Sequence, residues 1–133
     1  MKNQVYAGSP ANPRPVKCPT TVKSGDLVLV GTAPACALND YQSVSGGATF
    51  YFSGSFTGTV IGSSSHSPYT PTAINPGSPL YASGTLDSAT NVTTGLLITA
   101  TTSDTPFGRI DESGPGVSSG ATNTAAIIRF GDA

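Results

Sequence analysis

His66 is the only histidine of the chain, and hydroxyl groups surround it. The flanking serines are Ser63, Ser64, Ser65 and Ser67. A histidine beside a serine can act as the base that activates a nucleophile, and Asp40 or Asp104 could supply the orienting carboxylate of a hydrolase triad. The loop lacks, however, the Gly-x-Ser-x-Gly elbow that exposes such a nucleophile, and serines are common along the whole chain. The sequence therefore predicts a protein that is not an enzyme and has no catalytic residues.

The other groups that could bind a metal are two cysteines and scattered carboxylates. Cys18 and Cys36 do not have the spacing of a zinc site, and no run of aspartates has the pattern of a calcium loop. The aspartates lie in turn-like settings, where a short carboxylate accepts backbone hydrogen bonds. The aspartates in such settings are Asp26, Asp87 and Asp104. The pair Asp111-Glu112 is typical of a solvated edge. We expect no metal and no cofactor.

The two cysteines could instead form one disulfide. The N-terminal sequence lacks the apolar centre of a signal peptide, and two cysteines in a chain without a secretion signal are more often reduced and partly buried. No apolar run approaches the roughly 20 residues needed to span a bilayer. We therefore expect free thiols in a soluble protein made in the cytoplasm, with no membrane partner.

Charge is sparse in this sequence. Charged residues make up 10% of the 133 residues, against roughly 25% in a typical globular protein, and the formal net charge is −1. The cations are Lys2, Arg14, Lys17, Lys23, Arg109 and Arg129. Because they form no basic stripe along the sequence, phosphate-backbone binding lacks its driving force, and nucleic acid is not an expected partner.

An unbroken apolar run, Leu27 to Val30, is the element around which the rest of the chain is organised. A turn-forming cluster precedes it, and Gly31 to Pro34 separates it from a second short apolar run. Four consecutive apolar residues must be covered on both faces. The pattern therefore predicts a β ribbon that crosses the middle of the domain, away from its rim.

Short β-branched or aromatic segments with glycine turns make up the rest. Expected strands are 41–44, 48–61 with bends at Gly54 or Gly58, 80–86, 96–100, 107–111 and 124–130. We expect Phe50, Phe52, Phe56 and Val60 to share one buried face. No helical periodicity occurs over ten or more residues, so we expect little or no helix beyond one turn near 70–75. The fold class predicted is all-β, one domain with a single core, either a barrel or a sandwich.

Residues 1–21 are predicted to form an extended, proline-rich N-terminal arm, and residues 22–133 the β domain. Closely spaced prolines exclude a helix, and few apolar anchors are available to order the arm. Such an arm is either frayed or laid on a partner. The candidate partner-binding residues of the arm are Val5, Tyr6, Arg14, Pro15, Val16 and Lys17.

The order of these features resembles a family of small tailed-phage head proteins, long known as a domain of unknown function, that includes capsid decoration (cement) proteins. The series is SGDLVLVG, ACAL, FTGTV, NPGSPLYAS, FGRIDES and TAAIIRF. Family positions are matched by Pro19, Gly25-Asp26, Val30-Gly31, Gly77-Ser78-Pro79-Leu80-Tyr81 and Phe107-Gly108. The resemblance covers about residues 19 to 130. The chain departs from the family in its low charge and in two long loops, 62–76 and 112–123.

The resemblance implies a β-barrel or β-tulip-like domain that assembles as a homotrimer on the outer surface of the virion. It also implies an arm that contacts the major capsid protein and a role in stabilising the assembled head. The alternative function is a carbohydrate- or host-binding β module on a virion. Its candidate platform residues are Tyr41, Tyr69 and Tyr81, although tryptophan, the commonest sugar platform, is absent.

Overall fold

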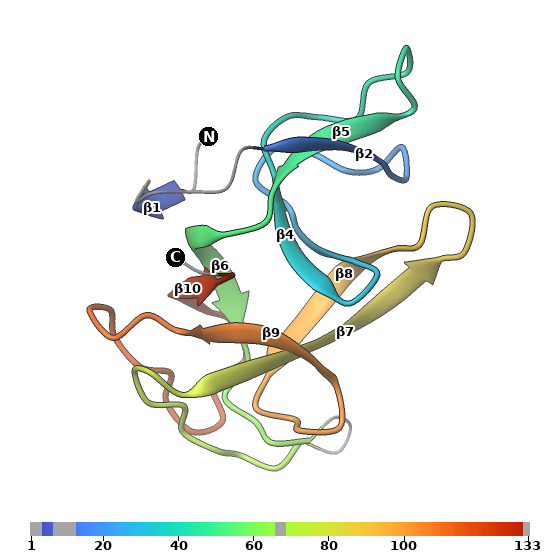
Figure 1. Ribbon diagram of the computed structural model, residues 1–133. Helices are drawn as coiled ribbons and strands as arrows, with labels where there is room; N and C mark the ends of the chain where they lie inside the picture. The colour runs from blue at the N-terminus through green and yellow to red at the C-terminus, as the bar shows by residue number, and fades with distance from the viewer. Residues whose placement is uncertain (1–3, 7–12, 66–68, 132–133) are drawn as a thin grey trace.

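Ten strands form a single antiparallel sheet in the computed structural model, which describes residues 4–6, 13–65 and 69–131 (Figure 1). The strands are β1 (Gln4–Tyr6), β2 (Arg14–Lys17), β3 (Leu27–Val30), β4 (Ala33–Ala37), β5 (Gly47–Tyr51), β6 (Gly54–Val60), β7 (Pro79–Asp87), β8 (Val92–Thr99), β9 (Thr105–Ile110) and β10 (Thr124–Phe130). Their order in the sheet is β1-β6-β10-β9-β7-β8-β3-β4-β5-β2. The all-β prediction is confirmed, and the described residues contain no helix.

The β3–β4 ribbon lies inside the sheet, as predicted, because β3 pairs with both β4 and β8. Alternate residues of β3 point to opposite faces, and both faces are covered. Leu29 joins a large core with Phe56 and Phe107, whereas Val28 joins a small core with Phe50. The expectation of a single core is therefore wrong. The ribbon lies between two core clusters. Because β3 is apolar at every position, each of its faces can pack against one of them.

β5 and β6 are two halves of one bent segment, joined by Phe52 and Ser53 (Figure 1). Gly54 has a φ of 134°, which a residue with a side chain rarely adopts, so the bend falls there as predicted. The bend carries the chain from the small core, which contains Phe50, to the large core, which contains Phe56. The expectation that these phenylalanines share one face is wrong for this reason.

Gly58, the other glycine proposed for a bend, lies inside β6, where it makes room for neighbouring side chains. A Cβ there would lie 2.5 Å from Leu27 Cδ1 and 2.8 Å from Ile128 Cδ1. Glycine at this position therefore lets β3 and β10 side chains approach the backbone of β6.

The N-terminal segment runs antiparallel along the bent segment. β1 pairs with β6, with Gln4 opposite Phe56, and β2 pairs with β5, with Arg14 opposite Phe50. Each is an end strand of the sheet. Beyond β2, Cys18 and Val22 are buried in the small core, so packing continues across the boundary drawn at residue 21.

Two local expectations are wrong. Residues 41–44 do not form a strand, because Gln42 and Gly47 close a turn with their backbones and leave Val44 fully exposed. Residues 70–75 form no helical turn, since isolated bridges join Pro71 to Ser63 and Ile74 to Val117 and hold this segment extended.

The sheet also remains open, because its end strands β1 and β2 do not pair with one another.

Candidate functional site

The groups of the conceivable hydrolase triad serve the loops and turns in which they lie. Ser63 is buried, and its hydroxyl accepts hydrogen bonds from the Ser65 and Thr70 backbones at 3.2 and 3.1 Å. The Asp40 carboxylate accepts the Ser24 N–H at 2.8 Å. His66 and Ser67 lie outside the described residues. The described part of the chain therefore offers no assembled nucleophile and base.

The two cysteines are free thiols and both are buried, as predicted. Burial raises the pKa of the Cys18 thiol, so the reactive thiolate is disfavoured. Within residues 4–6, 13–65 and 69–131, no group of three or more histidine, cysteine, aspartate or glutamate side chains is placed to hold a metal ion.

The capsid-binding residues predicted for the arm fall on the two end strands. Val5 and Tyr6 belong to β1, and their side chains lie outside the described structure. Arg14 and Lys17 bracket β2: the Arg14 guanidinium lies 4.3 Å from the Phe52 ring centre, and Lys17 Nζ donates to the Ser45 carbonyl at 3.3 Å.

Between them on β2, Pro15 is exposed, whereas Val16 packs against the small core. The accessible part of β2 is therefore its unpaired outer edge together with Arg14, Pro15 and Lys17.

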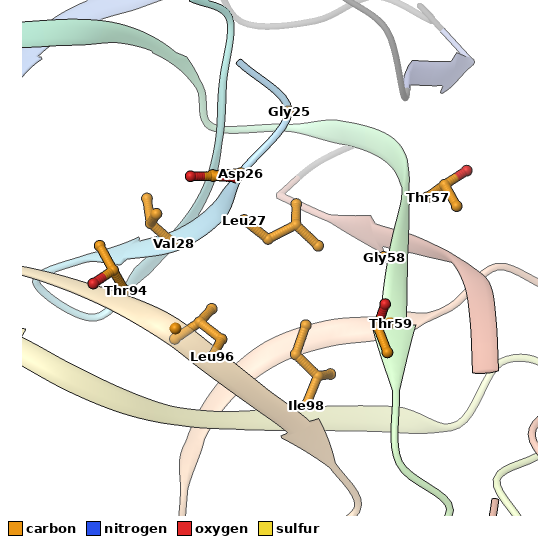
Figure 2. Close-up of a pocket in the computed structure, with 11 residues that line it drawn as sticks. Gly25, Asp26, Leu27, Val28, Thr57, Gly58, Thr59, Thr94, Leu96 and Ile98 are labelled. Carbon is orange, nitrogen blue, oxygen red and sulfur yellow. The ribbon is translucent and has the colours of Figure 1, made fainter. Parts of the chain in front are cut away.

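A groove of about 390 Å³ opens where β6 and β8 diverge, with the start of β3 above it (Figure 2). We call it the threonine groove. Its lining includes the hydroxyl-bearing Thr57, Thr59 and Thr94 and the apolar Leu27, Leu96 and Ile98. β8 pairs with β3 only at Val92 and Thr93. Farther along β8, the Ile98 carbonyl accepts the Ile61 N–H at 2.9 Å, so the groove lies between these two points of contact.

Figure 2 shows Leu27, Leu96 and Ile98 converging on the floor of the threonine groove. Asp26 is its one titratable lining residue, and the Asp26 carboxylate already accepts the Lys23 N–H at 2.9 Å. The groove therefore has the chemistry to hold a neutral polar ligand or an extended chain, but it lacks an acid–base pair.

The tyrosines proposed as a sugar platform do not gather on one face. Tyr41 packs against the small core, Tyr81 lies on β7, and Tyr69 is exposed in the loop after β6. No ring contact joins any two of them among the described residues.

The chain also builds a polar cluster at one end of the sheet that the sequence does not signal. Asp111 is buried, and its carboxylate accepts the Ser113 hydroxyl at 2.6 Å, the Ser113 N–H at 2.9 Å and the Ser55 hydroxyl at 3.2 Å. These bonds, the Ser113 hydroxyl first, lower the pKa of Asp111, and the nearby Arg129 charge adds to the effect. The expectation of a solvated edge is wrong for Asp111, whereas Glu112 is exposed.

No family model, no curated protein and no solved structure matches the chain. The described residues contain no helix of the length and apolarity needed to cross a bilayer.

Proposed function

We propose that this protein is a non-enzymatic capsid decoration (cement) protein of a tailed phage. In this proposal it binds the outside of the assembled head as a homotrimer and bridges neighbouring major capsid protein subunits. One observation supports the proposal above others: the N-terminal segment supplies both end strands of the sheet, β1 and β2. The outer edges of these strands carry unpaired backbone groups, which can pair with an extended segment of another protein.

The barrel or β-tulip-like form belongs to the same proposal. Its support is that the strands next to the two ends of the sheet, β6 and β5, are the two halves of the bent segment, and that the end strands β1 and β2 pair with them. If the bent segment is counted as one strand, the order returns to its starting point. A solved structure with a continuous closed ladder would establish this form.

Binding strength would come from several weak contacts acting together. Ordering an arm costs conformational entropy, so a single copy binds weakly, whereas three copies on a trimer bind with a high effective concentration. A protein that binds the assembled shell better than free subunits stabilises that shell by mass action. The low charge of the chain also limits repulsion between closely packed neighbours.

A carbohydrate- or host-binding module is the second candidate. The observation that favours it is the hydroxyl-lined threonine groove, in which Asp26 is the one titratable lining residue. Glycan binding that persists without the N-terminal segment would support this function and would leave decoration unsupported.

Light scattering of the purified protein should first give the mass of a trimer. Deletion of residues 1–13 is then the decisive test of decoration. The cut must spare Cys18, which is buried at 3% exposure, and β2, which pairs with β5. We expect the truncated protein to keep its β-sheet circular dichroism but to lose co-sedimentation with undecorated, expanded heads of its own phage. Normal decoration by the folded, truncated protein would refute a role for residues 1–13, including β1, and would leave the β2 edge as the remaining candidate.

A further inference from the structure

A second groove, of about 580 Å³, lies across β7, β9 and β10 at the end of the sheet. We call it the arginine groove. Its lining includes Pro79, Tyr81, Pro106, Arg109, Arg129 and Phe130. None of its lining residues is acidic, although the whole chain has a formal net charge of −1. The groove is therefore a local concentration of positive charge on a nearly neutral molecule.

A β-bulge sets the position of Arg109. Leu80 pairs with Gly108 and Tyr81 with Pro106, so Phe107 is an extra residue on β9. The extra residue lets both Phe107 and Ile110 turn into the large core, and Arg109 between them faces out. Gly108 permits this, because its φ is 136° and a Cβ there would lie 2.3 Å from the Arg129 carbonyl oxygen.

The two arginines stand directly opposite one another in the ladder between β9 and β10. Like charges in that relation destabilise a sheet. Arg129 Nη2 contacts Glu112 at 2.7 and 3.0 Å, but Arg109 is exposed and has no ion pair among the described residues. Part of the positive charge in the groove is therefore not neutralised within the described part of the molecule.

We propose that the arginine groove binds the carboxylates of an acidic segment on a partner protein. A guanidinium presents a planar set of donors that matches a carboxylate, and two guanidinium groups side by side suit neighbouring acidic residues. Tyr81 and the two prolines supply apolar walls of the kind found in protein interfaces. Charge complementarity thus identifies the class of partner.

A protein partner fits this groove better than a nucleic acid. Two arginines in a short groove neutralise few phosphates, and the other cations in the described part of the chain, Arg14, Lys17 and Lys23, do not line it. Under the proposed function the acidic segment belongs to the capsid shell. That assignment rests on the proposed function, whereas the affinity for carboxylates does not.

The test uses the full-length protein and a fluorescein-labelled hexapeptide of alternating aspartate and glutamate, read by fluorescence anisotropy. We expect binding that weakens with added salt, and about a tenfold weaker Kd for Arg109→Ala, the loss expected for one charge-assisted contact. Lys23→Ala is the control, since Lys23 is also an exposed cation but lies in the turn before β3 and does not line the groove. Arg109→Lys keeps the charge without the planar donor set and should recover only part of the affinity.

Three results would overturn the proposal. They are no binding of the acidic peptide by the wild-type protein, equal binding by Arg109→Ala, and tighter Arg109-dependent binding of a six-nucleotide thymidine strand than of the peptide. A peptide of asparagine and glutamine gives the uncharged baseline.

Co-sedimentation of the same variants with phage heads separates the two proposals. If heads bind wild type and Arg109→Ala equally, the capsid shell is not the partner of the arginine groove, and the proposed decoration function is unaffected. If heads bind neither wild type nor any variant, while binding of the acidic peptide still depends on Arg109, the decoration function is refuted and the proposal for the arginine groove is retained.

Discussion

Asp111 shows how one buried carboxylate can stabilise the end of the sheet. Hydrogen bonds from the Ser113 hydroxyl and N–H and from the Ser55 hydroxyl satisfy its oxygens and lower its pKa. Ser55 belongs to β6, whereas Asp111 and Ser113 follow β9, so the carboxylate joins segments that are distant in sequence. A buried charge with this many donors is retained only while the donors are in place.

We expect Asp111→Asn to lower the free energy of unfolding by about 2 kcal/mol at pH 7, the scale for hydrogen bonds to a charged group. Because the pKa is lowered on folding, the ionised carboxylate stabilises the fold fully above its ordinary value of 3.8. This contribution is lost as the pH falls through the folded-state pKa.

Urea unfolding at pH 7 and at a pH below the folded-state pKa of Asp111 measures this difference. Wild type and Asp111→Asn should differ at pH 7 and converge in acid. A gap of equal size at both pH values would show that the substitution acts through packing and not through the charge.

Sequence reasoning at the residue scale succeeded where a side chain's local setting decides its role. The assignment of Asp26 to a turn is confirmed by its bond to the Lys23 N–H, and buried free cysteines were expected. It could not find the Arg109–Arg129 pair, because that pair exists only through the register of β9 and β10. Nor could it find the burial of Asp111, which depends on a serine from another strand.

At the scale of elements, the bulge in β9 controls both the core and the arginine groove. It places Phe107 against Phe130, with ring centres 5.5 Å apart, and it turns Arg109 outward. Gly108 holds this geometry because its backbone passes close to the backbone of β10. A residue with a Cβ cannot occupy this place without moving one of the two strands.

We expect Gly108→Ala to destabilise the protein by at least about 2 kcal/mol, through a strained φ and a backbone clash. Gly95→Ala is the control, because Gly95 has a φ of 64° but no atom within 4 Å of an added Cβ. Its cost should be limited to the strain of the left-handed conformation, about 1 kcal/mol.

The midpoints of denaturant unfolding, compared at equal slope, measure both costs. Equal losses for the two variants would mean that the approach of β9 to β10 contributes nothing at Gly108.

The sequence located strands better than the connections between them. Residues 27–30 and 124–130 are strands with the predicted bounds, because short apolar runs of this kind favour a strand over a turn or a helix. The strand expected at 41–44 does not form, because those residues belong to a hydrogen-bonded turn. β8 begins earlier than expected, at Val92, because the threonines before Leu96 also favour a strand. Strand order was not predictable, since pairing joins segments with no local signal for one another.

At the scale of the whole molecule, the two cores share the β3–β4 ribbon. Ala35 and Ala37 face the small core, and Cys36 between them faces the large core. If the ribbon moves out of one core, its contacts with the other core are lost as well. We therefore expect the domain to unfold as one cooperative unit despite its two clusters.

Phe50→Ala tests this, because Phe50 is fully buried in the small core alone. We expect a loss of about 3–5 kcal/mol that also lowers the exchange protection of amides in β10, on the large core. Leu97→Ala, at a side chain 41% exposed, should cost about 0.5 kcal/mol or less. Unchanged protection in β10 of the Phe50→Ala variant would show two independent units.

The antiparallel course of the N-terminal segment along the bent segment also bears on how the chain folds during synthesis. β1 and β2 leave the ribosome first, yet their partners β6 and β5 lie at 47–60, and β6 in turn requires the last strand, β10. Closing such distant pairs is slow, on the order of milliseconds to seconds for β proteins. β1 must therefore wait for β10 to complete the pairing of β6, whereas β2 needs only β5. Until then the growing chain depends on the local hairpins β3–β4 and β7–β8 for early structure.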